Sequence, residues 1–193
     1  EQQTVGKLLR LKPRLNLTAD QEEAVRAILT RQADQATAVA EKMFSGKLSR
    51  EDMTSVQTGA GDPEAEIKAL LTPEQLTAYA EFKQEEHVSN ARLVANAELL
   101  QMQAAVGLTQ EQQDKVYNAL YDYTLDTLSG KVGAPPADMT DPAAAMNWQL
   151  DRKVKAIEPV LTPEQLEAYR KIQESQRKMI EGFLPAKAEP AQP

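Results

Sequence analysis

The sequence of 193 residues contains no cysteine and a single histidine, His87. Without cysteine the chain cannot form a disulfide, a thiolate zinc site or an iron–sulfur cluster, and one histidine cannot supply a metal site that needs two imidazoles. Gly-rich phosphate loops and nucleophile elbows do not occur in the sequence either. We therefore predict no catalytic residue, no enzymatic activity and no cofactor.

Aromatic residues are scarce, at 5% of the chain, so that a core must be built from Leu, Val, Ile, Met and Ala. Such residues favour closely packed helices, and no segment shows the alternating pattern of a strand. No apolar run approaches the roughly 20 residues that a membrane-spanning helix requires. The composition predicts an all-α fold without a transmembrane segment.

Basic residues are outnumbered, with 22 Lys and Arg against 29 Asp and Glu and a net charge of −7. Nucleic-acid binding depends on clustered Lys and Arg, and we therefore predict no nucleic-acid partner. Four basic residues and no acid do gather in residues 2–15: Lys7, Arg10, Lys12 and Arg14. This basic segment is either a solvated or internally paired face, or a contact for a membrane or a partner.

The sequence repeats itself. Residues 71–79, LTPEQLTAY, and residues 161–169, LTPEQLEAY, differ at one position, and LTADQ at 17–21 is related to LTQEQ at 108–112 by nearly the same offset. Two copies of a unit of about 90 residues indicate a duplicated domain. We predict two tandem helical-hairpin repeats, residues 1–87 and 88–184, followed by a disordered tail over 185–193.

The four repeated motifs share the pattern Leu-Thr-x-x-Gln, which is that of a capping box. The Thr hydroxyl at the N-cap accepts from the N3 amide, and the Gln side chain at N3 reaches back to the N-cap amide. Each motif thus predicts a helix start, and its residues are predicted to be structural: Leu17, Thr18, Gln21, Leu71, Thr72, Gln75, Leu108, Thr109, Gln112, Leu161, Thr162 and Gln165.

Two further helix starts are indicated by Asp62-Pro63 and Asp141-Pro142, since Asp is a good N-cap and Pro suits the first helical position. A helical pattern can run from Pro73 to Val106. Within it, however, the polar residues 83–90 indicate either a solvent-spanning helix or a break between the repeats.

Candidate binding residues are few. Tyr117, Tyr121 and Trp148 could provide a protein-binding surface because aromatic side chains offer a large contact area, and core packing is the alternative for them. The carboxylate pairs Glu81/Glu85 and Asp122/Asp126 could hold a hard divalent cation. We predict no metal site, and keep metal binding as an alternative function.

The segment LNLTADQEEAVRAIL from Leu15 and the two LTPEQL segments resemble the LTxxQ-motif family of extracytoplasmic stress proteins, which includes Spy-like chaperones and CpxP-like signalling inhibitors. The resemblance covers most of residues 16–184 in two copies. It implies small helical protomers that dimerise into a cradle. A tandem chain would then be a monomer that forms a Spy-like pseudo-dimer, or a homodimer.

The resemblance also implies a periplasmic or otherwise extracytoplasmic location after removal of a signal peptide, as expected for a chain that begins at Glu1. The expected function is that of an ATP-independent, chaperone-like protein or an envelope-stress accessory. Its partners would be unfolded or envelope proteins, bound in an apolar groove between the repeats. The alternatives are a divalent-metal-binding or sensing protein and a structural scaffold.

Overall fold

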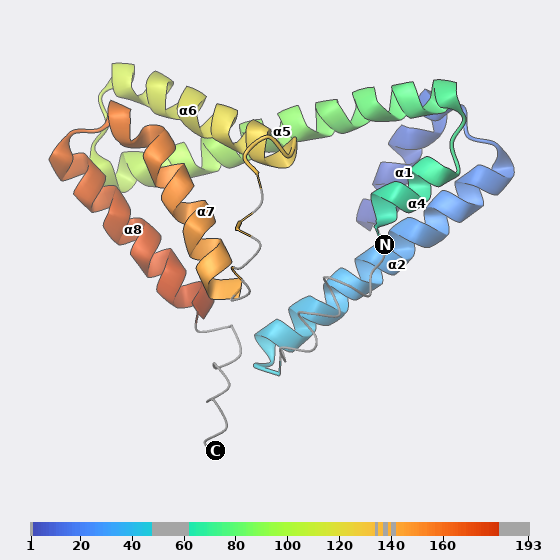
Figure 1. Cartoon of the computed structure of the whole chain (residues 1–193), viewed down its shortest axis with the longest axis horizontal. Coiled ribbons are helices and arrows are strands. Elements are labelled where there is room, and N and C mark those ends of the chain that lie inside the picture. Colours follow the sequence, from blue (N-terminus) through green and yellow to red (C-terminus); the bar gives the residue numbers. More distant parts are fainter. Residues whose placement is uncertain (1, 48–61, 134, 137–138, 140–141, 182–193) are drawn as a thin grey trace. The chain divides into compact units, whose positions relative to one another are not determined.

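The computed structural model describes residues 2–47, 62–133, 135–136, 139 and 142–181, and these residues are helical with short connections (Figure 1). No strand occurs among them, which confirms the all-α prediction. No helix in this part of the chain has the length and apolar character needed to cross a membrane. The helices are α1 Gln2–Leu15, α2 Ala19–Phe44, α4 Pro63–Ala69, α5 Pro73–Val106, α6 Gln110–Leu128, α7 Pro142–Ile157, the 3-10 helix η1 Glu158–Val160 and α8 Pro163–Glu181.

Contacts among the described residues divide the chain into two compact units, which we call unit 1 (residues 2–83) and unit 2 (residues 84–181). Helix α5 contributes its first turns to unit 1 and the rest to unit 2, and it continues through the polar residues 83–90 without a break. The predicted N-cap Asp141 and the predicted tail 185–193 lie outside the described residues.

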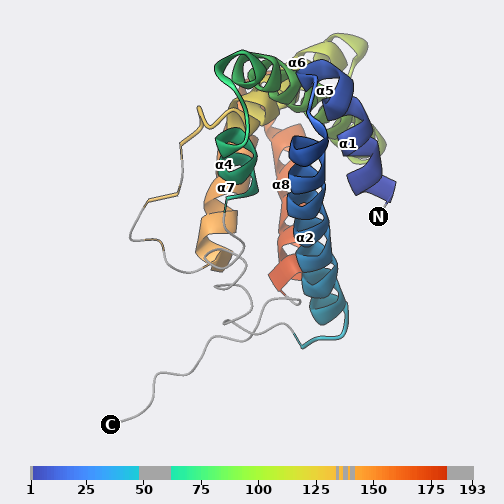
Figure 2. The same cartoon turned by 90° about the vertical axis from the view of Figure 1, so that its right-hand side faces the viewer.

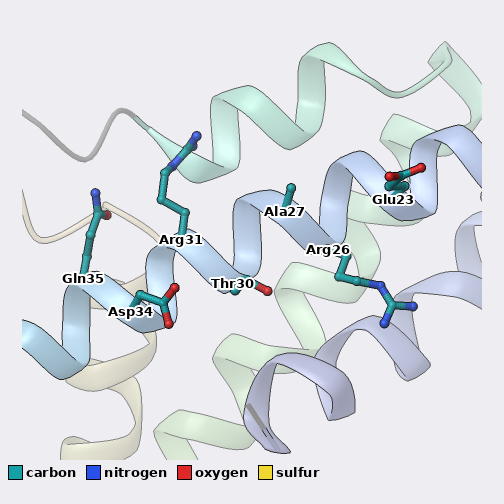
Figure 3. A pocket seen from close by; sticks show the side chains of 7 residues that line it. All are labelled: Glu23, Arg26, Ala27, Thr30, Arg31, Asp34 and Gln35. Carbon is teal, nitrogen blue, oxygen red and sulfur yellow. The ribbon is translucent and has the colours of Figure 1, made fainter.

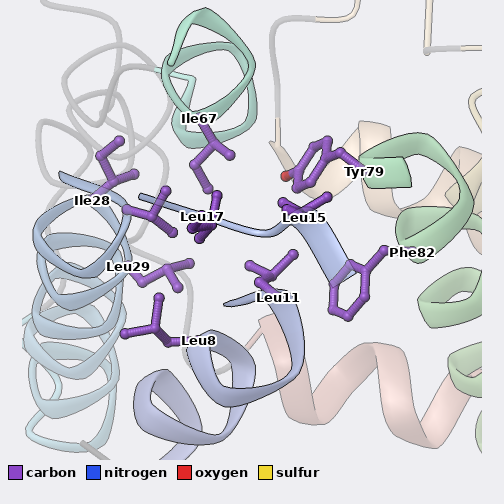
Figure 4. Close-up of a cluster of buried hydrophobic side chains, with 10 residues drawn as sticks. Leu8, Leu11, Leu15, Leu17, Ile28, Leu29, Ile67, Tyr79 and Phe82 are labelled. Atoms are coloured by element: carbon purple, nitrogen blue, oxygen red, sulfur yellow. The ribbon is translucent and has the colours of Figure 1, made fainter. Parts of the chain in front are cut away.

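The core of unit 1 forms where α1, α2, α4 and the start of α5 meet (Figure 4). Helices α1 and α2 contact each other along their apolar faces and lie side by side in both overall views (Figures 1 and 2). Tyr79 and Phe82 of α5 close this core from the other side. Its buried members are Leu8, Leu11, Leu15, Leu17, Val25, Ile28, Leu29, Ile67, Tyr79 and Phe82.

Unit 2 has a core of its own between the second part of α5 and helices α6, α7 and α8. Tyr169 of α8 is fully buried in it, as Tyr79 is nearly fully buried in unit 1. The buried members are Ala95, Met102, Val106, Leu108, Val116, Leu120, Val154, Ile157 and Tyr169.

The connections that lead into α2 and α6 are built alike. Helix α1 ends at Leu15 and is followed by Asn16 with φ 47°, and α5 ends at Val106 and is followed by Gly107 with φ 66°. Asn and Gly are the residues that best tolerate this left-handed conformation after a helix C-terminus. The chain therefore reverses within three residues, which brings the capping threonine directly after the preceding helix.

Candidate functional site

All four Leu-Thr-x-x-Gln motifs form capping boxes. At Thr18 the hydroxyl accepts a hydrogen bond from the Gln21 backbone N–H at 3.2 Å, and the Gln21 Oε1 accepts one from the Thr18 N–H at 3.1 Å. The same two hydrogen bonds are present at Thr72, Thr109 and Thr162. Four helix N-termini thus have their first amide groups satisfied by local side chains.

The glutamines of these motifs also pair with one another across unit 1. Gln21 Nε2 donates to Gln75 Oε1 at 2.9 Å, and Gln75 Nε2 donates to Gln21 Oε1 at 3.0 Å. Each amide then donates to the carbonyl of the helix that precedes the other motif: Gln21 to Leu70 O at 2.7 Å, and Gln75 to Leu15 O at 2.9 Å. We call this arrangement the crossed glutamine pair.

Unit 2 contains the same crossed glutamine pair. Gln112 Nε2 donates to Gln165 Oε1 at 2.7 Å and to Val160 O at 3.1 Å. Gln165 Nε2 donates to Gln112 Oε1 at 3.1 Å and to Gly107 O at 3.3 Å. In each unit one pair of side chains therefore caps two helix N-termini and also donates to two backbone carbonyl groups at or just after the ends of the preceding helices.

The crossed glutamine pairs explain why the motif occurs twice in each unit. A glutamine that only capped its own helix would need no second motif, whereas the observed pair requires two helix corners that face each other. Because both glutamine amides of each pair are engaged in these bonds, they link the two helix corners of their unit.

A second polar cluster lies inside unit 2 and is centred on Glu98 of α5, whose side chain is 11% exposed. Lys153 Nζ of α7 lies 2.8 Å from Glu98 Oε2, while the Tyr169 hydroxyl and Gln173 Nε2, both on α8, donate to Glu98 Oε1, the latter at 3.1 Å. A buried carboxylate is stable only when it is paired and hydrogen-bonded in this way. The Glu98 cluster thus ties three helices together.

Burial, followed by the nearby Glu98 carboxylate, raises the pKa of the Tyr169 hydroxyl well above its usual value. Burial also raises the pKa of Tyr123, whose hydroxyl donates to Gln149 O at 2.8 Å. Both shifts keep the phenol protonated in the folded chain under conditions in which the unfolded chain would begin to ionise.

We expect the stability of unit 2 to fall as the pH rises above about 10, the ordinary pKa of tyrosine. The folded pKa of Tyr169 is raised, so its contribution is complete below pH 10 and is lost at higher pH as the unfolded state releases a proton, with a slope of at most about 1.4 kcal/mol per pH unit. Urea unfolding between pH 7 and 11 should show a shallower fall for Tyr169→Phe. Parallel curves for the two proteins would contradict this prediction.

The candidate binding aromatics lie on α6 and α7 and are all partly buried. Tyr117 and Tyr121 stack with their ring centres 6.2 Å apart and pack against the core of unit 2. The Arg152 guanidinium lies 4.7 Å from the centre of the Trp148 ring, in cation–π geometry. All three side chains therefore have contacts within unit 2 and remain partly exposed.

The basic segment 2–15 corresponds to α1 and is engaged within unit 1. Lys12 Nζ lies 2.6 Å from Glu22 Oε2, and the Arg10 guanidinium lies 5.6 Å from the centre of the Phe82 ring. Lys7 and Arg14 also have interaction partners. These contacts favour the internally paired interpretation of the segment.

Two surface hollows carry mixed charge. One of 560 Å³ lies along α2 (Figure 3). Beside it, the Arg26 guanidinium donates a hydrogen bond to the Glu22 carboxylate, and that of Arg31 donates to the Glu66 carboxylate. Another of 510 Å³ lies between α7 and α8. It is spanned by two ion pairs, Arg177 with Asp151 at 3.2 Å and Arg170 with Glu158 at 3.6 Å. Neither hollow gathers the base, nucleophile and oxyanion donors that a catalytic site combines.

Metal-ligating side chains stay dispersed in the part of the chain that the structure describes. No group of three or more His, Asp or Glu side chains there is arranged to hold a metal ion. The pair Glu81/Glu85 lies on α5, and the pair Asp122/Asp126 lies on α6, where Asp126 is 3.4 Å from Lys131 Nζ. Among the described residues, neither pair is joined by a third carboxylate or imidazole in a metal-binding arrangement.

Unit 2 exposes apolar side chains on the outer face of α5. Leu93 is 69% and Leu100 is 68% exposed, and Ala97 and Ala104, also exposed, lie on the same helix face at spacings of 4, 3 and 4 residues. We call these four residues the α5 strip. It lies opposite the buried residues Ala91, Ala95, Met102 and Val106 of the same helix.

The α5 strip is also free of charge. From Leu93 to Gln110 the only charged residue is Glu98, which is turned inward to Lys153, whereas 26% of the whole chain is charged. Val94, 44% exposed, borders the strip together with the neutral side chains Asn90, Asn96, Gln101 and Gln103. Depletion of charge around exposed apolar residues is typical of the centre of a protein–protein interface.

The described residues form an all-helical protein of two units, and each unit contains a crossed glutamine pair. No protein-family model matches the chain, and neither a curated protein nor a solved structure matches it.

Proposed function

We propose that this chain is a non-enzymatic protein that binds exposed apolar segments of other proteins and keeps them soluble without ATP. The observation that carries the proposal is the α5 strip, an exposed apolar and uncharged face on a chain whose net charge is −7. Apolar segments would lie against Leu93 and Leu100, while the acidic remainder of the molecule would keep the complex in solution.

The proposal includes the extracytoplasmic location and the unfolded or envelope protein partners that the LTxxQ resemblance predicts. It also includes an origin of the chain by duplication. Supporting the duplication, units 1 and 2 each contain two capping boxes joined by a crossed glutamine pair, with corresponding residues 90 or 91 positions apart.

We expect the wild-type chain to suppress aggregation of a chemically denatured client at equimolar concentration, and Leu100→Glu to reduce that suppression several-fold. A carboxylate in the centre of the strip would have to lose its hydration when a client binds, without a partner to compensate. Light scattering of the diluted client over time measures the effect.

Leu9→Glu is the matched control. Leu9 lies on α1 at the position of unit 1 that corresponds to Leu100, and it is 66% exposed against 68% for Leu100. Both variants should retain the helical circular dichroism of the wild type, since neither side chain is in a core. Equal loss of suppression in the two variants would show that the α5 strip is not the client site, and no suppression by the wild type would contradict the proposed function itself.

A further inference from the structure

The α5 strip has the spacing of a helix-pairing surface. Leu93, Ala97, Leu100 and Ala104 follow one another at 4, 3 and 4 residues, the spacing of the two apolar positions in a coiled-coil heptad. The large side chains occupy one of these positions and the small ones the other. A second helix could therefore approach closely at the alanines and place its own large side chains there.

From this pattern we infer that the α5 strip is covered by a second copy of the chain, with the two α5 helices antiparallel about a two-fold axis. If the axis passes midway between residues 98 and 99, Leu93 faces Ala104 of the partner subunit. Ala97 likewise faces Leu100 of the partner subunit. Every leucine then lies against an alanine, and the strip is complementary to itself, as a two-fold symmetric interface requires.

Charge favours the same occupant. Two copies with a net charge of −7 repel each other wherever their acidic surfaces meet. Between Leu93 and Gln110, however, the single charge of Glu98 is held inward by Lys153, so this part of α5 brings no like charges to the contact between two strips. A partner that brought a charged side chain to the strip would leave that charge desolvated and unpaired.

The size of the strip predicts a weak dimer. From Leu93 to Ala104 the helix advances about 17 Å at 1.5 Å per residue, and one helix face of this length offers less than the roughly 800 Å² per partner that stable complexes bury. We expect a dissociation constant on the order of 100 μM. Self-pairing would cover the strip when no client is bound. That role rests on the proposed function, but the pairing itself can be tested without any client.

The absence of cysteine from the chain allows a direct test by cross-linking. We would prepare Leu93→Cys and Ala104→Cys separately, oxidise each alone and as an equal mixture at 200 μM protein, and separate the products on a non-reducing gel. In the antiparallel register, two copies of the same variant place their cysteines about 17 Å apart along the axis, too far for a disulfide. Residues 93 and 104 of different copies lie opposite each other.

The expected result is a cross-linked dimer that is at least several-fold more abundant in the mixture than in either variant alone. Cross-linking of each variant with itself would overturn the antiparallel register. Sedimentation velocity from 10 to 500 μM should show a rising weight-average mass for the wild type and Leu9→Glu, but not for Leu100→Glu. A wild type that stays monomeric throughout would overturn the self-pairing, and would leave client suppression, measured separately by light scattering, unaffected.

Discussion

Replacing Glu98 by alanine is expected to lower the free energy of unfolding of unit 2 by about 3–4 kcal/mol. The substitution leaves the ammonium group of Lys153, whose side chain is 17% exposed, without the carboxylate that compensates its burial. It also removes the acceptor of the Tyr169 hydroxyl and of the Gln173 amide. Urea unfolding followed by circular dichroism measures the loss, which we expect in the transition that belongs to unit 2.

Two control variants separate the charge of Glu98 from its hydrogen bonds. Glu98→Gln retains an oxygen that can accept from Tyr169 but has no charge for Lys153, and we expect a smaller loss than for alanine. Glu111→Ala breaks an exposed pair with Lys115 on α6, and its unfolding curve should overlay that of the wild type. If Glu98→Ala also unfolded like the wild type, the cluster would contribute nothing to stability.

Replacing Gln112 by alanine should destabilise unit 2 by about 2–3 kcal/mol. The Gln112 side chain accepts from the Thr109 N–H and donates to Val160 O, and it exchanges two hydrogen bonds with Gln165. Alanine therefore removes a helix cap, takes the side-chain donor from Val160 O and breaks both bonds to Gln165. Urea unfolding again provides the measurement.

Gln112→Glu distinguishes the crossed glutamine pair from simple helix capping. Glutamate is as good as glutamine at the third position of a capping box, so a capping role alone predicts wild-type stability for this variant. In the structure, however, a carboxylate oxygen would replace the donor group that faces Gln165 Oε1 and Val160 O, and we expect a loss at least as large as that of alanine. Wild-type stability of Gln112→Glu would contradict the importance of the pair.

Much of the fold could be predicted from the sequence because helix starts are chosen by local chemistry. A threonine with glutamine three residues later satisfies the first amides of a helix whatever surrounds it, and α2, α5, α6 and α8 all begin directly after such a threonine. Helix α4 begins after Asp62, which accepts from the N–H groups of Glu64 and Ala65.

Structural features that depend on packing between helices could not be predicted from such local patterns. The apolar face of α1, for example, is stabilised by packing on α2 and α4. From the sequence, residues 83–90 could form either a break or part of a continuous helix. The helix continues there, with the residues on either side of that stretch anchored in two different cores.

The sequence by itself determined the helical fold, the positions at which most helices begin and the resemblance between the two halves of the chain, since all three follow from short-range patterns. Only the tertiary structure decided that Gln21 meets Gln75, that Gln112 meets Gln165 and that Glu98 points inward. These contacts join residues about 50 or more positions apart, and no local pattern sets such a distance. The inward Glu98 also leaves the outer face of α5 uncharged, and our proposals for function depend on that face.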